Sequence, residues 1–419
     1  GAASRSRPVL SVSEAGVGAA PWLLFHCPSE AQAQMPLLFV LACACFIGGL
    51  MIRLIDPVVP EIAADLATSE ASVSLLASAY AVPYALVQPV LGPVGDLIGK
   101  TRVIKICLAC LAAASALTVV ANSIEVMFAA RVLGGLAGGG IIPLALATVG
   151  DHVAFEKRQV ALSQILTAMI AAVLVGTIGT GLAASLIGWR GAFAIATIMA
   201  VAAFVLAMVS LEETRPSPGR RSLSDQLASA LEGYGQVFAN ARAYVCYAGV
   251  FVEGVLIFGL LPYIATLLTA RGAGGSFEAG MVLAGMAIGG LVYTQLVARL
   301  IGRMGGIANL IRVGGVFLSI GFAGVALQGS WGVEMAAFAL LGFGFYSIHN
   351  SLQTQATELA PGHRGASVAL HAFFFFLGQS AGPVLYAVAL EAVPVWELLS
   401  AVAIVAFLLS ILLAHALRR

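Results

Sequence analysis

Four charged side chains lie inside long apolar stretches of this sequence: Arg53, Asp56, Arg131 and Glu253. A charge at the centre of a membrane-spanning helix costs about 3 kcal/mol, so such residues usually serve a function. A carboxyl group can bind and release a proton, whereas an arginine stays protonated at any working pH. Asp56 and Glu253 are therefore candidate proton carriers, and Arg53 and Arg131 are candidate partners of a carboxylate.

Asp56 lies in a segment that contains two prolines, Pro57 and Pro60. Prolines leave backbone carbonyls without partners, which a membrane tolerates only beside protein or water. This context suits a protonatable acid that lines a cavity. In the alternative interpretation, Arg53 and Asp56 are three residues apart and form a structural pair at the outer edge of the membrane.

Arg131 and Glu253 also leave alternatives open. Arg131 lies about 12 Å past Ser123 in a helix, deep enough to act on a buried acid or to bond carbonyls of the first span. Glu253 has no other charge in its own apolar stretch. Because burial favours the neutral form of a carboxyl group, Glu253 could bind a proton, contact a cationic substrate, or remain a neutral acid bonded between helices.

Polar and aromatic side chains in other apolar stretches are candidates for a substrate cavity. His349 and His371 could switch their charge near neutral pH, or could pack as neutral rings. Tyr80, Tyr84 and Gln88 recur every four residues, so they share one face of a helix. That face either lines a cavity or packs against a neighbouring helix.

The composition places all these residues in a membrane. Of the 419 residues, 60% are hydrophobic and only 10% are charged, against about 25% charged in a soluble domain. The net charge of +1 gives no basic character that would indicate a nucleic-acid partner. Cys107 and Cys110 share a helix face without a nearby histidine, so we expect packing and no metal site. No phosphate-binding loop or His-Glu-x-x-His helix occurs, so we predict neither an enzyme nor a cofactor.

Apolar stretches of about 20 residues, each long enough to span a bilayer, recur along the chain. They predict an all-α protein with twelve transmembrane helices, at 37–60, 71–94, 102–122, 125–149, 159–187, 190–211, 243–269, 277–301, 305–328, 332–355, 365–391 and 393–415.

Basic residues are concentrated in alternate loops, which indicates that both termini lie in the cytoplasm. The cytoplasmic set is Lys100, Arg102, Lys105, Lys157, Arg158, Arg215, Arg220, Arg221, Arg242, Arg299, Arg303, Arg312, Arg364, Arg418 and Arg419. The opposite side keeps only Arg190 and Arg271, so the asymmetry is strong.

The order of spans and loops predicts four parts. Residues 1–36 form a flexible cytoplasmic arm, 37–211 a first six-helix bundle, 212–242 a cytoplasmic linker with an amphipathic helix, and 243–419 a second bundle. The halves echo each other, since Leu97-Ile98-Gly99-Lys100 recurs as Leu300-Ile301-Gly302-Arg303. Two related bundles place a solute site at their interface near the middle of the membrane.

The segment Gly92-Pro93-Val94-Gly95-Asp96-Leu97-Ile98-Gly99-Lys100-Thr101-Arg102 is predicted as a short charged loop between two spans. It resembles the G-x-L-x-D-R-x-G-R-K loop between the second and third helices of major facilitator superfamily transporters. Further stretches resemble the drug:proton antiporter branch of that family. Arg131 to Gly135 resembles the fourth-helix R-x-x-Q-G motif, with Gly134 at the glutamine position, and Asp56 with Pro60 resembles the first-helix D-x-x-x-P pattern.

A fifth-helix glycine motif is also similar, in Gly176, Gly179 and Gly181, although Thr177 stands where that motif has proline. The resemblance implies two pseudo-symmetric six-helix bundles that work by alternating access, and it places Arg131 in proton coupling.

The same resemblance implies a conformational latch on the cytoplasmic side. Its members are Gly92, Asp96, Gly99, Lys100, Arg102 and Asp151. Asp96 is expected to cap the helix that follows Arg364, and Lys100 or Arg102 to pair with Asp151. These contacts would stabilise the state whose cytoplasmic side is closed; in the alternative, Asp96 and Asp151 are solvated loop acids.

Together these features predict a monomeric transporter in the lipid bilayer of a bacterial inner membrane, exporting small organic molecules in exchange for protons. A sugar or metabolite symporter or facilitator is the alternative within transport. A membrane receptor or scaffold that does not transport is the alternative from another class.

Overall fold

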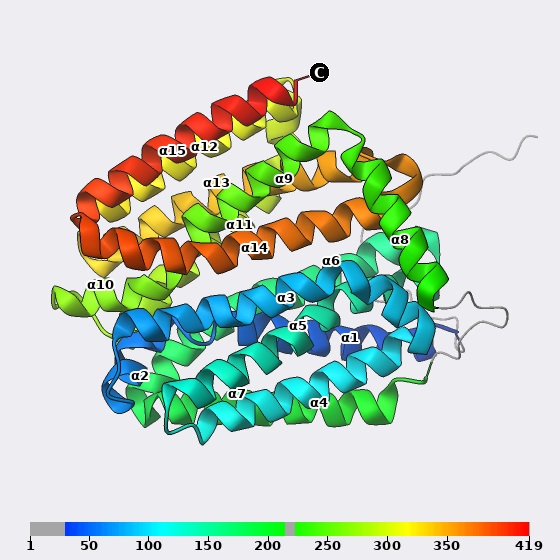
Figure 1. The fold of residues 1–419 in the computed structure, drawn as a ribbon, viewed down its shortest axis with the longest axis horizontal. Helices are drawn as coiled ribbons and strands as arrows, with labels where there is room; N and C mark the ends of the chain where they lie inside the picture. Colours follow the sequence, from blue (N-terminus) through cyan, green and yellow to red (C-terminus); the bar gives the residue numbers. More distant parts are fainter. Residues whose placement is uncertain (1–29, 214–222, 419) are drawn as a thin grey trace, which may run out of the picture.

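The computed structural model describes residues 30–213 and 223–418. This part of the chain is almost entirely helical and contains no strand. Figure 1 shows the long helices lying side by side, with the first half of the chain in the lower part of the view and the second half in the upper part. The predicted all-α membrane fold is confirmed.

The first half contains seven α-helices in the described residues. They are α1 (Glu30–Arg53), α2 (Val59–Asp65), α3 (Glu70–Ile98), α4 (Lys100–Val119), α5 (Ile124–His152), α6 (Phe155–Leu174) and α7 (Thr180–Ser210). Helix α1 therefore begins seven residues before the expected first span. Serine side chains cap two of the helices: Ser69 accepts from the Ser72 N–H and Ser123 from the Val126 N–H.

The second half contains eight helices in the described residues. They are α8 (Leu223–Phe238), α9 (Ala241–Glu253), α10 (Ile264–Ala270), α11 (Ser276–Met304), α12 (Ile307–Ala326), α13 (Trp331–Glu358), α14 (Arg364–Ala392) and α15 (Val395–Ala416). Helix α8 occupies the residues for which the sequence predicts an amphipathic helix.

Eleven helical stretches of the described chain are long and apolar enough to cross a membrane. One of them, Val160–Ser210, has 51 residues, which is about 75 Å of helix and far more than one bilayer thickness. It is interrupted at Gly188, whose φ of 77° and ψ of 164° are not helical. Counted as two crossings, this stretch brings the total to the twelve that the sequence predicts.

The predicted loop at 92–102 is almost all helix, so this expectation is wrong. Helix α3 continues to Ile98 and α4 begins at Lys100, so the reversal occurs at Gly99 alone, with φ 99°. Gly95 allows the close approach of α3 to α5, since a Cβ there would lie 2.6 Å from Leu144 Cδ2. A Cβ at Gly92 would meet nothing within 4 Å, so Gly92 is not needed for packing in this conformation.

Each half has its own apolar core. One core joins buried residues from Val40 to Leu211, and the other joins residues from Val237 to Leu417. The first core lies within the range 37–211, and the second begins at Val237, before the expected second bundle at 243–419. Helices α3 and α14 lie side by side where the halves meet (Figure 1).

The two ends of the molecule differ in how the halves meet. We call the end that carries α2 and α10 the α2 side and the end that carries α8 the α8 side (Figure 1). On the α2 side, the Ser276 hydroxyl donates to Glu61 across the two halves. Gly181 lies against the Ser276 backbone, and a Cβ at Gly280 would lie 2.5 Å from the Thr177 carbonyl oxygen. The α2 side is therefore tightly closed.

Helix α8 is attached to both halves. The Tyr234 hydroxyl donates to the Pro89 carbonyl of α3 at 2.6 Å. That carbonyl lacks its usual helical partner because Pro93, four residues later, has no N–H. The Asn240 amide donates to the Leu359 carbonyl at 3.0 Å, which holds the end of α8 to the second half.

Candidate functional site

A carboxyl group and two imidazoles meet inside the second half of the molecule. Glu253 is at the end of α9, His349 is in α13 and His371 is in α14. Glu253 is 1% exposed, and its Oε2 lies 3.0 Å from His349 Nδ1. The His349 and His371 rings lie edge to face, with centroids 4.9 Å apart. The sequence identifies each residue as a candidate, but it does not predict that they form one cluster.

This Glu253–His349–His371 cluster has few polar neighbours. The rings of Phe345 and Phe375 lie 4.9 Å and 4.6 Å from the His349 ring. Among the described residues, Glu253 Oε1 and His371 Nε2 have no hydrogen-bond partner.

The cluster can hold a proton in two ways. Either the neutral acid donates to the imidazole, or the carboxylate accepts from an imidazolium. Loss of that proton would leave an uncompensated negative charge in an apolar site, which is a costly state. The geometry therefore favours states in which the cluster keeps one proton.

Arg53 connects the two halves of the molecule. Its Nη1 lies 3.5 Å from Asp56 Oδ2, and its Nη2 donates to Gln379 Oε1 of α14 at 3.2 Å. The guanidinium lies 4.4 Å from the centroid of the Phe258 ring. Asp56 is fully buried, and its Oδ1 has no partner in the described chain. The two residues are thus close, as the structural alternative expects, and it is the bond from Arg53 to Gln379 that reaches the second half.

The guanidinium of Arg131 donates hydrogen bonds to two backbone carbonyls. Its Nη1 donates to the Met51 carbonyl at 2.9 Å and its Nε to the Leu76 carbonyl at 3.3 Å. Met51 lies in the last turn of α1, where carbonyls lack helical partners. The guanidinium also lies over the Tyr80 ring, 4.3 Å from its centroid. This geometry agrees with the alternative in which Arg131 bonds carbonyls of the first span.

The stripe of Tyr80, Tyr84 and Gln88 packs between helices. The Tyr80 hydroxyl lies so close to Gly138 of α5 that a Cβ at Gly138 would overlap with it. The centroids of the Tyr84 and Phe376 rings are 3.9 Å apart. Gln88 Nε2 donates at 3.2 Å to the Gly139 carbonyl, which Pro143 leaves without a helical partner. These side chains therefore join helices and do not line the main cavity.

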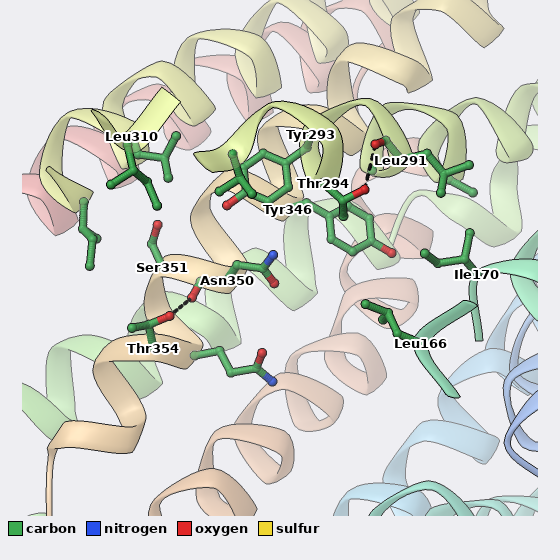
Figure 2. A pocket seen from close by; sticks show the side chains of 16 residues that line it. Leu166, Ile170, Leu291, Tyr293, Thr294, Leu310, Tyr346, Asn350, Ser351 and Thr354 are labelled. Atoms are coloured by element: carbon green, nitrogen blue, oxygen red, sulfur yellow. Dashed lines mark hydrogen bonds between the residues drawn. The ribbon is translucent and has the colours of Figure 1, made fainter. Parts of the chain in front are cut away.

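The main cavity lies between the halves toward the α8 side. It has a volume of about 470 Å³ and is lined by residues of α6, α11, α12 and α13 (Figure 2). Leu166 and Ile170 come from α6 in the first half, and the remaining lining comes from the second half. His349 and His371, which the sequence suggested as cavity candidates, are not among its lining residues.

The polar lining of this cavity was missed at the sequence level. Tyr346, Asn350 and Thr354 project from one face of α13, and Thr294 projects from α11 (Figure 2). A signal was present, because these α13 residues recur every four positions along the helix.

The latch residues make only part of the predicted set of contacts. Lys100 Nζ lies 2.6 Å from Asp151 Oδ2 and 3.4 Å from Asp96 Oδ1, all within the first half. No side chain caps α14, whose N-cap residue is His363, so the cap predicted from Asp96 is absent in this conformation. Arg102 is exposed. The Lys100–Asp151 pair forms while the α8 side holds an open cavity, so it does not require closure of that side.

These features define a class of protein: a membrane protein with two helical halves and a polar cavity and buried charges between them. The family model of the Major Facilitator Superfamily matches residues 41–383. The chain therefore belongs to the Major Facilitator Superfamily, whose members are transporters and not enzymes.

Several characterised relatives are drug-resistance proteins. Multidrug resistance protein 1 of Bacillus subtilis is 22% identical over 342 residues, covering 81% of this chain and 86% of the relative. The chloramphenicol resistance protein of Streptomyces lividans is 26% identical, covering 85% and 90%. The quinolone resistance protein NorA of Staphylococcus aureus is 23% identical, covering 83% and 88%.

Solved structures share the fold. The nucleoside transporter NupG superposes with a TM-score of 0.70 at 17% identity, covering 91% of this chain and 98% of NupG. The transporter PepTSo superposes with a TM-score of 0.73 at 15% identity, covering 93% and 98%.

Proposed function

We propose that this transporter exports small organic molecules from the cytoplasm in exchange for protons, working as a monomer in a bacterial inner membrane. The observation that carries the proposal is the Glu253–His349 pair, a buried carboxyl group 3.0 Å from an imidazole whose side chain is 14% exposed. A buried pair of this kind is expensive to ionise, so its protonation state can be coupled to a change of conformation.

Alternating access gives the two ends of the molecule their roles. The basic residues of the alternate loops lie on the α8 side, so we assign this side to the cytoplasm. Both termini are assigned to the same side. The closed α2 side and the cavity toward the α8 side then correspond to an inward-facing state. A solute from the cytoplasm would enter the cavity in this state.

Protonation of a second group, Asp56, would change the contact that Arg53 makes between the halves. Arg53 is shared between Asp56 of the first half and Gln379 of the second. Protonation of Asp56 would remove the negative charge that holds the guanidinium and would weaken its position between the halves. An inward proton releases about 2.3 kcal/mol per 100 mV of membrane potential, which is enough to bias two conformations that differ by a few kcal/mol.

Reconstituted vesicles test this proposal. The full chain would be placed in liposomes with the α8 side outward, an acidic lumen, and radiolabelled chloramphenicol or a labelled quinolone outside. We expect accumulation of a labelled drug above its external concentration, lost when the pH gradient is collapsed. Accumulation only with the opposite gradient would indicate a symporter, and simple equilibration a facilitator; either result would contradict the proposal.

A further inference from the structure

The 470 Å³ cavity is large enough for a drug-sized molecule, since such sites have volumes of about 300 to 1,000 Å³. It extends along α11 from Ala287 to Ile301 and reaches Ile307 at the start of α12. It is therefore off the axis of the molecule, on the side of the second half.

None of the 16 side chains that line the cavity is charged. The Glu253–His349–His371 cluster does not line it, and Arg53, which acts electrostatically on the Tyr346 hydroxyl, is not part of the lining either. A cation or anion that entered would lose water without gaining a counter-ion, and such a transfer costs several kcal/mol.

The cavity nevertheless offers hydrogen-bonding groups. The hydroxyls of Thr294, Ser351 and Thr354 donate to backbone carbonyls of their own helices, at 2.7 to 2.8 Å. The Tyr346 hydroxyl and the Gln353 amide remain available to a ligand, whereas the Asn350 amide already meets the Tyr293 hydroxyl, which also lines the cavity. An amide both donates and accepts, so this set matches ligand groups that do the same.

The opposite wall is apolar. Leu166 and Ile170 of α6 face the polar side chains of α13 across the cavity (Figure 2). A molecule held here would have one apolar face and one polar, uncharged face.

We propose that this cavity selects small uncharged solutes that carry an amide or hydroxyl group on an apolar skeleton. The proposal deepens the proposed export function and rests on it, because the cavity is taken as the entry site of the exported solute. It also separates the solute site from the proton site, so the solute and the proton act on each other through helix α13 and not through direct contact.

Three probes with the same skeleton test the selection: 4-phenylbutanamide, 4-phenylbutylammonium and 4-phenylbutanoate. Their binding to the full chain in lipid nanodiscs would be measured by ligand-detected NMR, with empty nanodiscs as the reference for partition into lipid. We expect the amide to bind about tenfold more tightly than either ion, a difference of about 1.4 kcal/mol. Equal or tighter binding of an ion would overturn the proposal.

A nearly isosteric substitution tests whether the selectivity for uncharged probes arises in this cavity. Asn350→Asp adds a negative charge to the lining, so we expect it to weaken the amide and to favour the ammonium probe. Gln353→Glu makes the same change at the exposed rim and serves if Asn350→Asp fails to fold. Asn122→Asp, in an exposed position on the α2 side, is the matched control and should change nothing. Unchanged preference in both cavity variants would contradict the assignment.

Two further results would separate a lipid site from a solute site, and the selectivity from the export function. If dioleoylglycerol displaced the amide probe at equal concentration, the site would belong to a neutral lipid and the solute assignment would be overturned. Binding is measured without a pH gradient, so failure of gradient-driven export would leave the binding result intact. Preference for an ion would in turn refute the selectivity and leave proton-coupled export open.

Discussion

At the scale of single residues, the buried charges divide into groups that can titrate and groups that hold backbone in place. Glu253 and Asp56 each have one carboxylate oxygen without a partner among the described residues. Arg131 bonds two carbonyls that belong to α1 and α3, and its Nη2 also has no partner among the described residues. The resemblance to antiporters and the geometry thus point to different roles for Arg131, and substitution can separate them.

Arg131→Lys is expected to lower stability without moving the pH profile of transport. Lysine cannot reach both carbonyls with a planar fork or stack on Tyr80, so at least one buried carbonyl loses its partner. The loss is expected to cost about 1 to 3 kcal/mol. Thermal unfolding in detergent and the pH dependence of vesicle transport are the two measurements. A shifted pH optimum with unchanged stability would restore the coupling role.

Asp56→Asn should loosen the contact of Arg53 between the halves. Asparagine has nearly the same shape, but it removes the charge that lies 3.5 Å from the guanidinium. We expect gradient-driven transport to fall at least about tenfold, a change of about 1.4 kcal/mol, while the folded protein is retained. Glu397→Gln, at an exposed acid at the start of α15, is the control. Full uphill transport in Asp56→Asn would remove Asp56 from the coupling mechanism.

The sequence predicts the candidates but not their partners. A lone charge in an apolar stretch is visible from composition, which identifies Asp56 and Glu253. The contact of Glu253 with His349 joins residues 96 positions apart, and that of Arg53 with Gln379 joins residues 326 positions apart. Such contacts depend on the packing of helices from different parts of the chain, and no periodicity within one helix reports them.

At the scale of helices, the spans follow from apolar length, whereas the turns depend on backbone detail. Glycine and charge at 92–102 indicate a loop, yet the helix continues to Ile98 because its apolar face remains packed against α5. Proline positions show which carbonyls lose a partner, as at Pro89 and Gly139. The sequence cannot show that Tyr234 and Gln88 supply the missing donors.

Gly280→Ala is expected to hold the α2 side open. A Cβ there would lie 2.5 Å from the Thr177 carbonyl oxygen, a contact that requires the segment Val175–Gly179, just before α7, to separate from α11. Transport should slow, and a cysteine at Thr177 should react faster with a membrane-impermeant thiol reagent added on the α2 side. Gly332→Ala, where a Cβ meets nothing within 4 Å, is the matched control. Unaltered labelling and transport in Gly280→Ala would show that this contact does not govern closure.

At the scale of the whole molecule, transport requires two arrangements of the halves. In this structure the α2 side is closed and Asp96 contacts Lys100. If Asp96 caps α14 only when the α8 side closes, then Asp96→Asn should favour the arrangement seen here. The residue would thus bias the equilibrium without touching the solute.

Thiol labelling measures that bias. In a background without native cysteines, Thr354→Cys places a thiol in the cavity lining. We expect Asp96→Asn to speed its labelling from the α8 side and to slow transport, with unchanged selectivity among solutes. Glu213→Gln, exposed near the end of α7, is the control. If Asp96→Asn changes neither rate, the latch does not exist.

The central claim is that the Glu253–His349–His371 cluster carries the proton that drives export. The most direct measurement compares uphill accumulation of a labelled drug in vesicles containing the wild-type chain, Glu253→Gln, or the exposed control Glu397→Gln. Glutamine keeps a hydrogen bond to His349 but cannot release a proton. The account predicts uphill accumulation in the wild type and the control, and only equilibration in Glu253→Gln, with exchange of drug across the membrane preserved. Accumulation by Glu253→Gln equal to that of the wild type would contradict it.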